Sequence, residues 1–175
     1  MKCSTAAPAA LLVSLLVSAP AFAQSVTGTI DSSITLLAAC EVNGSPATNG
    51  TDFGSLDFGS QSTFFSSATA QVQSGAGSAI EVRCAPGSDA TLTITSGQHD
   101  SAVAGSGRAL ASGANYVPYD IYRDAALQNV LANGATISIL ANGAIQQVPI
   151  YGRALGNSGL VPGTYTDTIA VTLDF

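Results

Sequence analysis

Residues 164–175 read TYTDTIAVTLDF, and no other stretch of the sequence indicates the fold as clearly. Apolar and polar side chains alternate along it, with Ile169, Val171, Leu173 and Phe175 on one parity and mostly threonine on the other. Successive side chains of a β-strand point to opposite faces, so this alternation predicts a strand with one apolar face. Threonine and β-branched residues also favour strands over helices.

The rest of the chain has the same character, with few charges and with short apolar stretches between Gly- and Asn-rich turns such as Asn133-Gly134. Many short strands between such turns predict an all-β sandwich or barrel. Pro118 and Pro149 fall within two of the expected strands, and we expect sheet edges or bulges there because proline donates no ladder hydrogen bond. The expected strands are residues 52–58, 78–84, 90–95, 116–123, 136–140, 146–152 and 163–175.

A further alternating stretch lies near the N-terminus. Val26, Gly28 and Ile30 alternate with polar residues, and the same parity continues through Ile34 and Leu36. This pattern predicts one long strand, or two strands end to end, before Cys40.

Residues 1–23 have the organisation of a secretory signal peptide. A positively charged start precedes an apolar run at residues 10–17, and Ala21-Phe22-Ala23 forms a small-x-small cleavage site. The apolar run is shorter than the ~20 residues that span a bilayer, so we expect no membrane insertion. The mature protein is expected to begin near Gln24, to be exported, and to have a length that suits one domain.

Two cysteines remain after the signal peptide is removed, because Cys3 leaves with it. Cys40 and Cys84 belong to a chain bound for an oxidising compartment, so the expected state is one disulfide. The alternative, a metal site or a reactive thiol, would need histidine or further cysteine nearby, and His99 is the only histidine.

The sequence contains no recognisable catalytic motif. His99 lies in a polar, turn-like stretch and is expected to be an exposed loop residue, and the pairs Asp52/Asp57 and Asp120/Asp124 are best interpreted as solvated surface acids. The formal net charge of −6 disfavours binding to nucleic acid or anionic lipid. We therefore expect a protein that is not an enzyme and has no cofactor, no metal and no nucleic-acid partner.

Seven segments, in order along the chain, resemble the spore coat protein U domain family, which includes subunits of Csu-type archaic chaperone–usher pili. The ordered set, with both cysteines, is more specific than any single segment. The segments are VTGTI (26–30), ACEV (39–42), FGSLDFG (53–59), IEVRC (80–84), YDIYRD (119–124), VPIYG (148–152) and GTYTDTIAVTLDF (163–175).

The resemblance implies an immunoglobulin-like β-sandwich that lacks its final strand, formed by residues 33–175, with residues 24–32 as an N-terminal donor-strand extension. In such families a periplasmic chaperone lends the missing strand, and an outer-membrane usher replaces it with the extension of the next subunit, a form of β-strand addition. By analogy, the donor residues are Val26, Gly28 and Ile30. The residues expected to line the acceptor groove and contact the chaperone are Ile34, Leu36, Ile169, Val171, Leu173 and Phe175.

This resemblance predicts a structural subunit of a bacterial surface pilus that acts in adhesion and biofilm formation. Two other hypotheses stay open. The first is a secreted spore- or cell-coat protein of the same family that no usher polymerises. The second is a carbohydrate-binding sandwich, which would need exposed aromatic platforms, although Tyr119 and Tyr122 fall on opposite faces of their expected strand. Neighbouring genes for a chaperone and an usher would favour the pilus.

Overall fold

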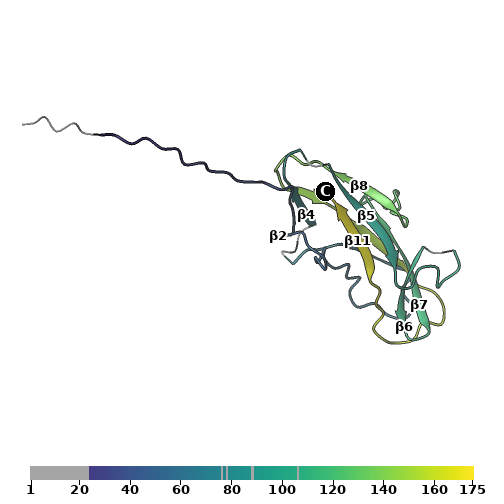
Figure 1. Cartoon of the computed structure of the whole chain (residues 1–175). Coiled ribbons are helices and arrows are strands. Elements are labelled where there is room, and N and C mark those ends of the chain that lie inside the picture. Colours follow the sequence, from purple (N-terminus) through teal and green to yellow (C-terminus); the bar gives the residue numbers. More distant parts are fainter. Residues whose placement is uncertain (1–23, 76, 78, 88, 106) are drawn as a thin grey trace, which may run out of the picture. The chain divides into compact units, whose positions relative to one another are not determined.

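The computed structural model describes residues 24–175 apart from residues 76, 78, 88 and 106 (Figure 1). The predicted signal peptide, residues 1–23, lies outside the described residues. The chain divides into two units, Met1–Thr35 and Leu36–Phe175. The described strands all belong to the second unit. They are β1 (Cys40–Val42), β2 (Ser45–Pro46), β3 (Ser67–Gln71), β4 (Ile80–Cys84), β5 (Ala90–Gly97), β6 (Arg108–Ser112), β7 (Asn115–Tyr122), β8 (Ala135–Ile139), β9 (Gln146–Val148), β10 (Tyr151–Leu155) and β11 (Ile169–Asp174).

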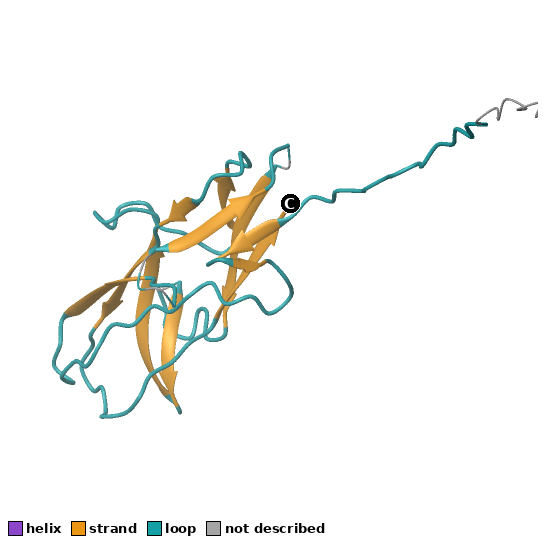
Figure 2. Ribbon diagram, turned by 90° about the vertical axis from the view of Figure 1, so that its left-hand side faces the viewer, coloured by secondary structure: helices purple, strands orange, loops and turns teal. Residues whose placement is uncertain are grey.

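The strands form three antiparallel sheets, with the orders β2-β1-β4-β9, β3-β10-β7-β6 and β11-β5-β8. Figure 2 shows that strands and loops account for the described chain, with no helix among them. The prediction of an all-β fold is therefore confirmed. The expected strand at residues 90–95 corresponds to β5, that at 116–123 to β7, and that at 136–140 to β8.

The inward faces of all three sheets meet in one apolar core. Leu92 and Ile94 of β5, Val82 of β4 and Ile121 of β7 are fully buried members of it. Buried and half-buried residues alternate along β5, as the period of two requires. The sheets thus pack around a shared core as a sandwich.

Both strand prolines lie where no ladder donor is needed. Pro149 lies between β9 and β10, at the point where the chain passes from the first sheet to the second. Pro118 pairs with Ala109 of β6, but the register between β7 and β10 ends one residue away, at Tyr119 and Ala154. Neither proline therefore interrupts the pairing between β7 and β10.

The strand predicted at the N-terminus is wrong for the chain on its own. Residues 24–39 have no regular secondary structure, and Val26, Ile30 and Ile34 are 95%, 97% and 83% exposed. A strand is stable only when its backbone N–H and C=O groups have a ladder partner. None of the strand pairs in the described part of the chain involves residues 24–39.

Candidate functional site

One edge of β11 has no strand partner in the described part of the chain. β11 pairs antiparallel with β5, where Val171 lies opposite Ile94 and Leu173 opposite Leu92. Figure 1 shows the two strands side by side. The opposite edge of β11 leaves backbone donors and acceptors available, which is the condition for adding another strand.

An apolar groove of about 820 Å³ runs along β11. One wall is formed by residues 167–173 and Phe175, and the other by residues 47–56 and Phe58. The floor is apolar and comes from β4, β5 and β7 and from the link between β9 and β10. It is formed by Ile80, Ile94, Tyr119, Ile121 and Ile150.

The predicted acceptor residues divide into two sets. Ile169, Val171 and Leu173 are half-buried on the groove side of β11, and Phe175, which is 47% exposed, lines the groove beyond them. Ile34 and Leu36 were expected opposite them. Leu36 is 82% exposed and is not among the residues that line the groove, and Ile34, in the first unit, is 83% exposed. Neither residue is part of a strand.

The second wall, residues 47–58, was expected to contain a strand at 52–58 and instead forms turns. The Asp52 Oδ1 carboxylate oxygen accepts a hydrogen bond from the Gly54 N–H at 2.8 Å, which bends the chain locally. Ser55 forms the one bridge of this segment, exchanging two backbone hydrogen bonds of 2.9 Å with Gln73. Gly54 has φ +115°, and a Cβ there would lie 2.6 Å from the Gln73 carbonyl oxygen, so glycine is required.

The apolar side chains of this wall line the groove and also pack against the core. Phe53, Leu56 and Phe58 are partly buried and pack against the core cluster. Gly152 of β10 permits this, because a Cβ at that position would lie 2.5 Å from a Leu56 methyl and 3.0 Å from the Phe58 ring. Sequence reasoning did not recognise residues 47–58 as a wall, although the motif FGSLDFG carried the signal.

A buried carboxylate, Asp167, is among the residues that line the groove. The Asp167 side chain is 1% exposed and accepts hydrogen bonds from the backbone N–H groups of Gln98 and His99, at 2.9 and 3.2 Å, and from the Tyr119 hydroxyl at 2.7 Å. The His99 Nδ1 atom lies 3.0 Å from the same carboxylate. Burial, and then the hydrogen bond with Asp167, raise the pKa of Tyr119 above its ordinary value. His99 lies in a turn, as expected, but its side chain is only 31% exposed and contacts Asp167, so it is not a freely exposed residue.

A second polar group holds the turn that supplies these donors. The guanidinium of Arg108 is almost fully buried and donates to the carbonyl oxygens of Thr95 and Leu131, at 3.2 and 3.4 Å. Its Nη1 atom also lies 3.5 Å from Asp100 Oδ1, and the Asn133 amide donates to Asp100 Oδ2. Asp167 is thus tied to β5 and β7 at once, which fixes the place where β11 begins.

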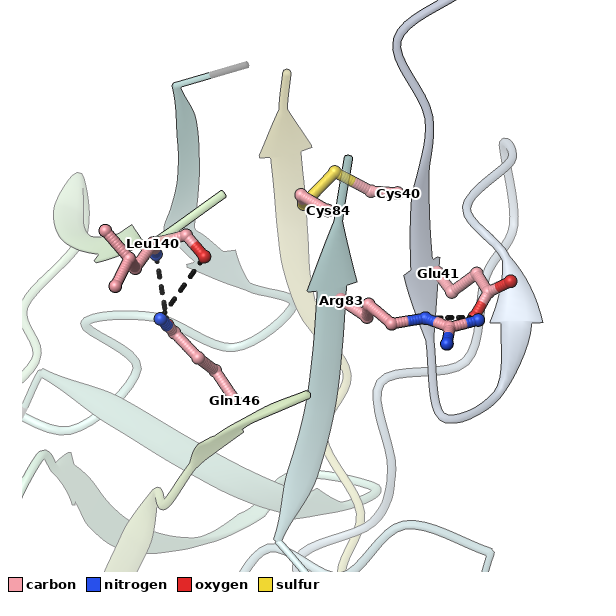
Figure 3. The surroundings of a disulfide bond; sticks show 6 residues. All are labelled: Cys40, Glu41, Arg83, Cys84, Leu140 and Gln146. Carbon is pink, nitrogen blue, oxygen red and sulfur yellow. Dashed lines mark hydrogen bonds and ion pairs between the residues drawn. A yellow bond between two sulfur atoms is a disulfide. The ribbon is translucent and has the colours of Figure 1, made fainter. Parts of the chain in front are cut away.

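Figure 3 shows the disulfide between Cys40 and Cys84. Cys40 is the first residue of β1 and lies opposite Cys84, the last residue of β4. Glu41 and Arg83, the next pair in the register, form an exposed ion pair of 2.5 Å. The predicted disulfide is confirmed, and it joins the two strands at the point where residues 24–39 enter the sandwich.

Two kinds of site are not found among the described residues. No group of three or more His, Cys, Asp or Glu side chains in residues 24–175, outside the four undescribed positions, is placed to hold a metal ion. The same described residues contain no helix that is long and apolar enough to cross a membrane.

The fold and the groove define a class of protein: an all-β sandwich whose last strand borders an apolar groove and presents an unpaired edge to it. The Spore Coat Protein U domain matches residues 26–172, and the chain belongs to this family. The resemblance inferred from the seven sequence segments is thereby confirmed.

The chain is also similar to a solved structure, the chaperone–tip adhesion subunit pre-assembly complex from the archaic chaperone–usher Csu pili of Acinetobacter baumannii. The match has 20% sequence identity and a TM-score of 0.49, and it covers 81% of this chain. It covers 40% of the solved chain. A search of curated proteins gave no match.

Proposed function

We propose that the protein is a structural subunit of a bacterial surface pilus, assembled by the chaperone–usher pathway through donor-strand exchange, with roles in adhesion and biofilm formation. The observation that carries this proposal is the apolar groove along the unpaired edge of β11. An open edge beside an apolar groove promotes aggregation unless another strand covers it. In the proposed function, a chaperone supplies that covering strand first and a neighbouring subunit then replaces it.

The same chain carries a segment suited to be that strand in another molecule. Val26, Gly28 and Ile30 share one parity, and the two apolar side chains are almost fully exposed. Burying each of them in a neighbour's groove would contribute about 1.5–3 kcal/mol before ordering costs. Ladder hydrogen bonds to β11 would add affinity that does not depend on sequence.

Donation of residues 24–32 from one molecule to the groove of the next is a head-to-tail contact. Such an interface is heterologous and does not close on itself, so it produces a filament. The partners are other pilin subunits, a periplasmic chaperone that covers the groove before assembly, and an outer-membrane usher that catalyses the exchange. The family resemblance supports the chaperone and the usher, and the signal peptide predicted at residues 1–23 supports export to the cell surface.

The test is a charge placed in the donor segment. Ile30→Asp should leave folding on the chaperone unchanged and prevent polymerisation, because the carboxylate would have to enter an apolar groove. Thr29→Asp is the matched control, since it adds the same charge at the neighbouring position of opposite parity. Fibres on cells are counted by electron microscopy, and chaperone–subunit complexes are quantified by co-purification.

Three results would be informative. Fibres with Thr29→Asp and none with Ile30→Asp support donor-strand exchange in the proposed register. Normal fibres from Ile30→Asp would refute that register. A wild-type protein that is secreted as a stable monomer, with no fibre in the presence of its neighbouring chaperone and usher, would instead favour the unpolymerised coat protein.

A further inference from the structure

The disulfide encloses one wall of the groove and leaves the other outside. Cys40 and Cys84 are 44 residues apart in sequence, and the wall formed by residues 47–58 lies within the loop that they close. The other wall, β11, lies outside this loop. The segment proposed to enter the neighbouring subunit, residues 24–32, joins the sandwich at Cys40.

We propose that the Cys40–Cys84 disulfide carries tension around the 47–58 wall, so that a subunit under load keeps its hold on its neighbour. This inference rests on the proposed function, because it requires that residues 24–32 of one subunit be held in the groove of another. Tension then enters each sandwich through Cys40 and leaves through the strand bound beside β11.

Without the disulfide, tension at the entry point would be resisted by a short strand, by its buried Val42 side chain and by the flanking backbone hydrogen bonds of Ala39 with Ala85 and of Asn43 with Glu81. β1 has three residues, and its register with β4 consists of three pairs. The Glu41–Arg83 ion pair beside the disulfide is exposed, and exposed ion pairs contribute little. Peeling of β1 would next load β2, which has two residues, and then the 47–58 wall itself. A subunit pulled by one neighbour would thus dismantle the groove that holds the other.

With the disulfide, tension takes a shorter covalent route. It passes from Cys40 to Cys84, the last residue of β4, and from there to β5, which follows in the chain. β5 lies between β8 and β11 and pairs with β11 from Gly97 to Thr91. The load therefore reaches the strand next to the groove while residues 41–83 stay unloaded.

The experiment compares finished fibres with the disulfide intact and opened. Cys40→Ser subunits are expected to be degraded in the periplasm before assembly, so purified wild-type fibres are reduced and alkylated, and mass spectrometry verifies modification of Cys40 and Cys84. Single fibres are then pulled, and in parallel the rate of subunit release is measured without load. Fibres of Arg83→Gln subunits are the matched control, because they lack the ion pair between the same two strands and keep the disulfide.

We expect reduced fibres to break at lower force than intact fibres, after extension steps of up to roughly 150 Å, the extended length of the freed loop. Reduction should change the rate of subunit release without load by a smaller factor than the rate of fibre breakage under load. Fibres of Arg83→Gln subunits should match wild-type fibres in both rates. The proposed path of tension through the disulfide would be overturned if reduction changed subunit release and fibre breakage by equal factors. It would also be overturned if fibres with verified reduction broke at the same force as intact fibres. Failure of the wild-type chain to form any fibre would count against the proposed function instead.

Discussion

A single charge on β11 tests the groove from the acceptor side. Val171 is the middle of the three half-buried side chains of β11, between Ile169 and Leu173, whereas its neighbour Thr172, although part of the same wall, is exposed and has the opposite parity. We predict that Val171→Asp weakens binding of a donor strand by a few hundred-fold. Thr172→Asp, with the same added charge one residue away, should bind as wild type.

The magnitude follows from what the bound strand does to the Val171 position. In the free subunit Val171 is partly in contact with water, so an aspartate there keeps much of its hydration. A bound strand would cover it, which removes about 1.5 kcal/mol of apolar contact and adds at least about 2 kcal/mol for desolvating or protonating an unpaired carboxylate. A total near 3.5 kcal/mol corresponds to a few hundred-fold in affinity, at about 1.4 kcal/mol per tenfold.

The assay uses the subunit in complex with its periplasmic chaperone. A fluorescent peptide of residues 24–35 replaces the chaperone strand, and anisotropy gives the bound fraction as the peptide concentration rises. Urea unfolding of the peptide-free complexes shows whether either substitution damages the sandwich itself. Wild-type peptide affinity in Val171→Asp, or equal losses in both variants, would refute the assignment of this face of β11 to the donor strand.

Two predictions concern the framework of the groove. Tyr119→Phe removes the 2.7 Å hydrogen bond to the buried Asp167 carboxylate and should lower the free energy of unfolding by about 1.5–3 kcal/mol in urea titrations. The pKa of Tyr119 is higher in the folded state than its ordinary value near 10, so its contribution to the free energy of unfolding is complete below pH 10 and declines as the pH rises further. If the stability of Tyr119→Phe declined at alkaline pH as much as that of the wild type, this assignment would be contradicted. Gly156→Ala would place a Cβ 1.7 Å from the Phe65 carbonyl oxygen and should lower the free energy of unfolding by at least about 3 kcal/mol. Gly75→Ala is the control, since no atom lies within 4 Å of its Cβ, and it should be close to neutral in the same titrations. Equal effects of the two substitutions would show that the close approach to Phe65 does not matter for stability.

Features that depend on local pattern were predictable from the sequence. The alternation of Ile169, Val171 and Leu173 predicted the strand and the face on which these side chains are half-buried, but not the irregularity in its register with β5 between Ile169 and Val171. The disulfide was predictable because Cys40 and Cys84 are the only cysteines after residue 23. Family resemblance, and not periodicity, supplied the idea of an acceptor groove.

Features that depend on a partner or on long-range packing were not predictable. The alternation at Val26 and Ile30 predicts a strand correctly only if a ladder partner exists, and the part of the chain that the structure describes provides none. Residues 52–58 were also expected to form a strand, but Asp52 and Gly54 turn the chain there. The buried group formed by Asp167, His99 and Tyr119 joins three distant parts of the sequence, so no local sequence motif could predict it.

The two walls of the groove present different chemistry to an incoming strand. Along β11 the backbone edge is unpaired, so any extended chain can form a ladder with it. In the 47–58 wall, the backbone N–H and C=O groups of Ser55 are already hydrogen-bonded to Gln73. An incoming strand can therefore contact this wall through the side chains of Phe53, Leu56 and Phe58. β11 therefore offers hydrogen bonds to strands in general, which the proposed exchange of a chaperone strand for a neighbour's strand would require. The 47–58 wall provides the side-chain contacts that can distinguish one donor from another, and the Cys40–Cys84 disulfide closes the loop that carries it.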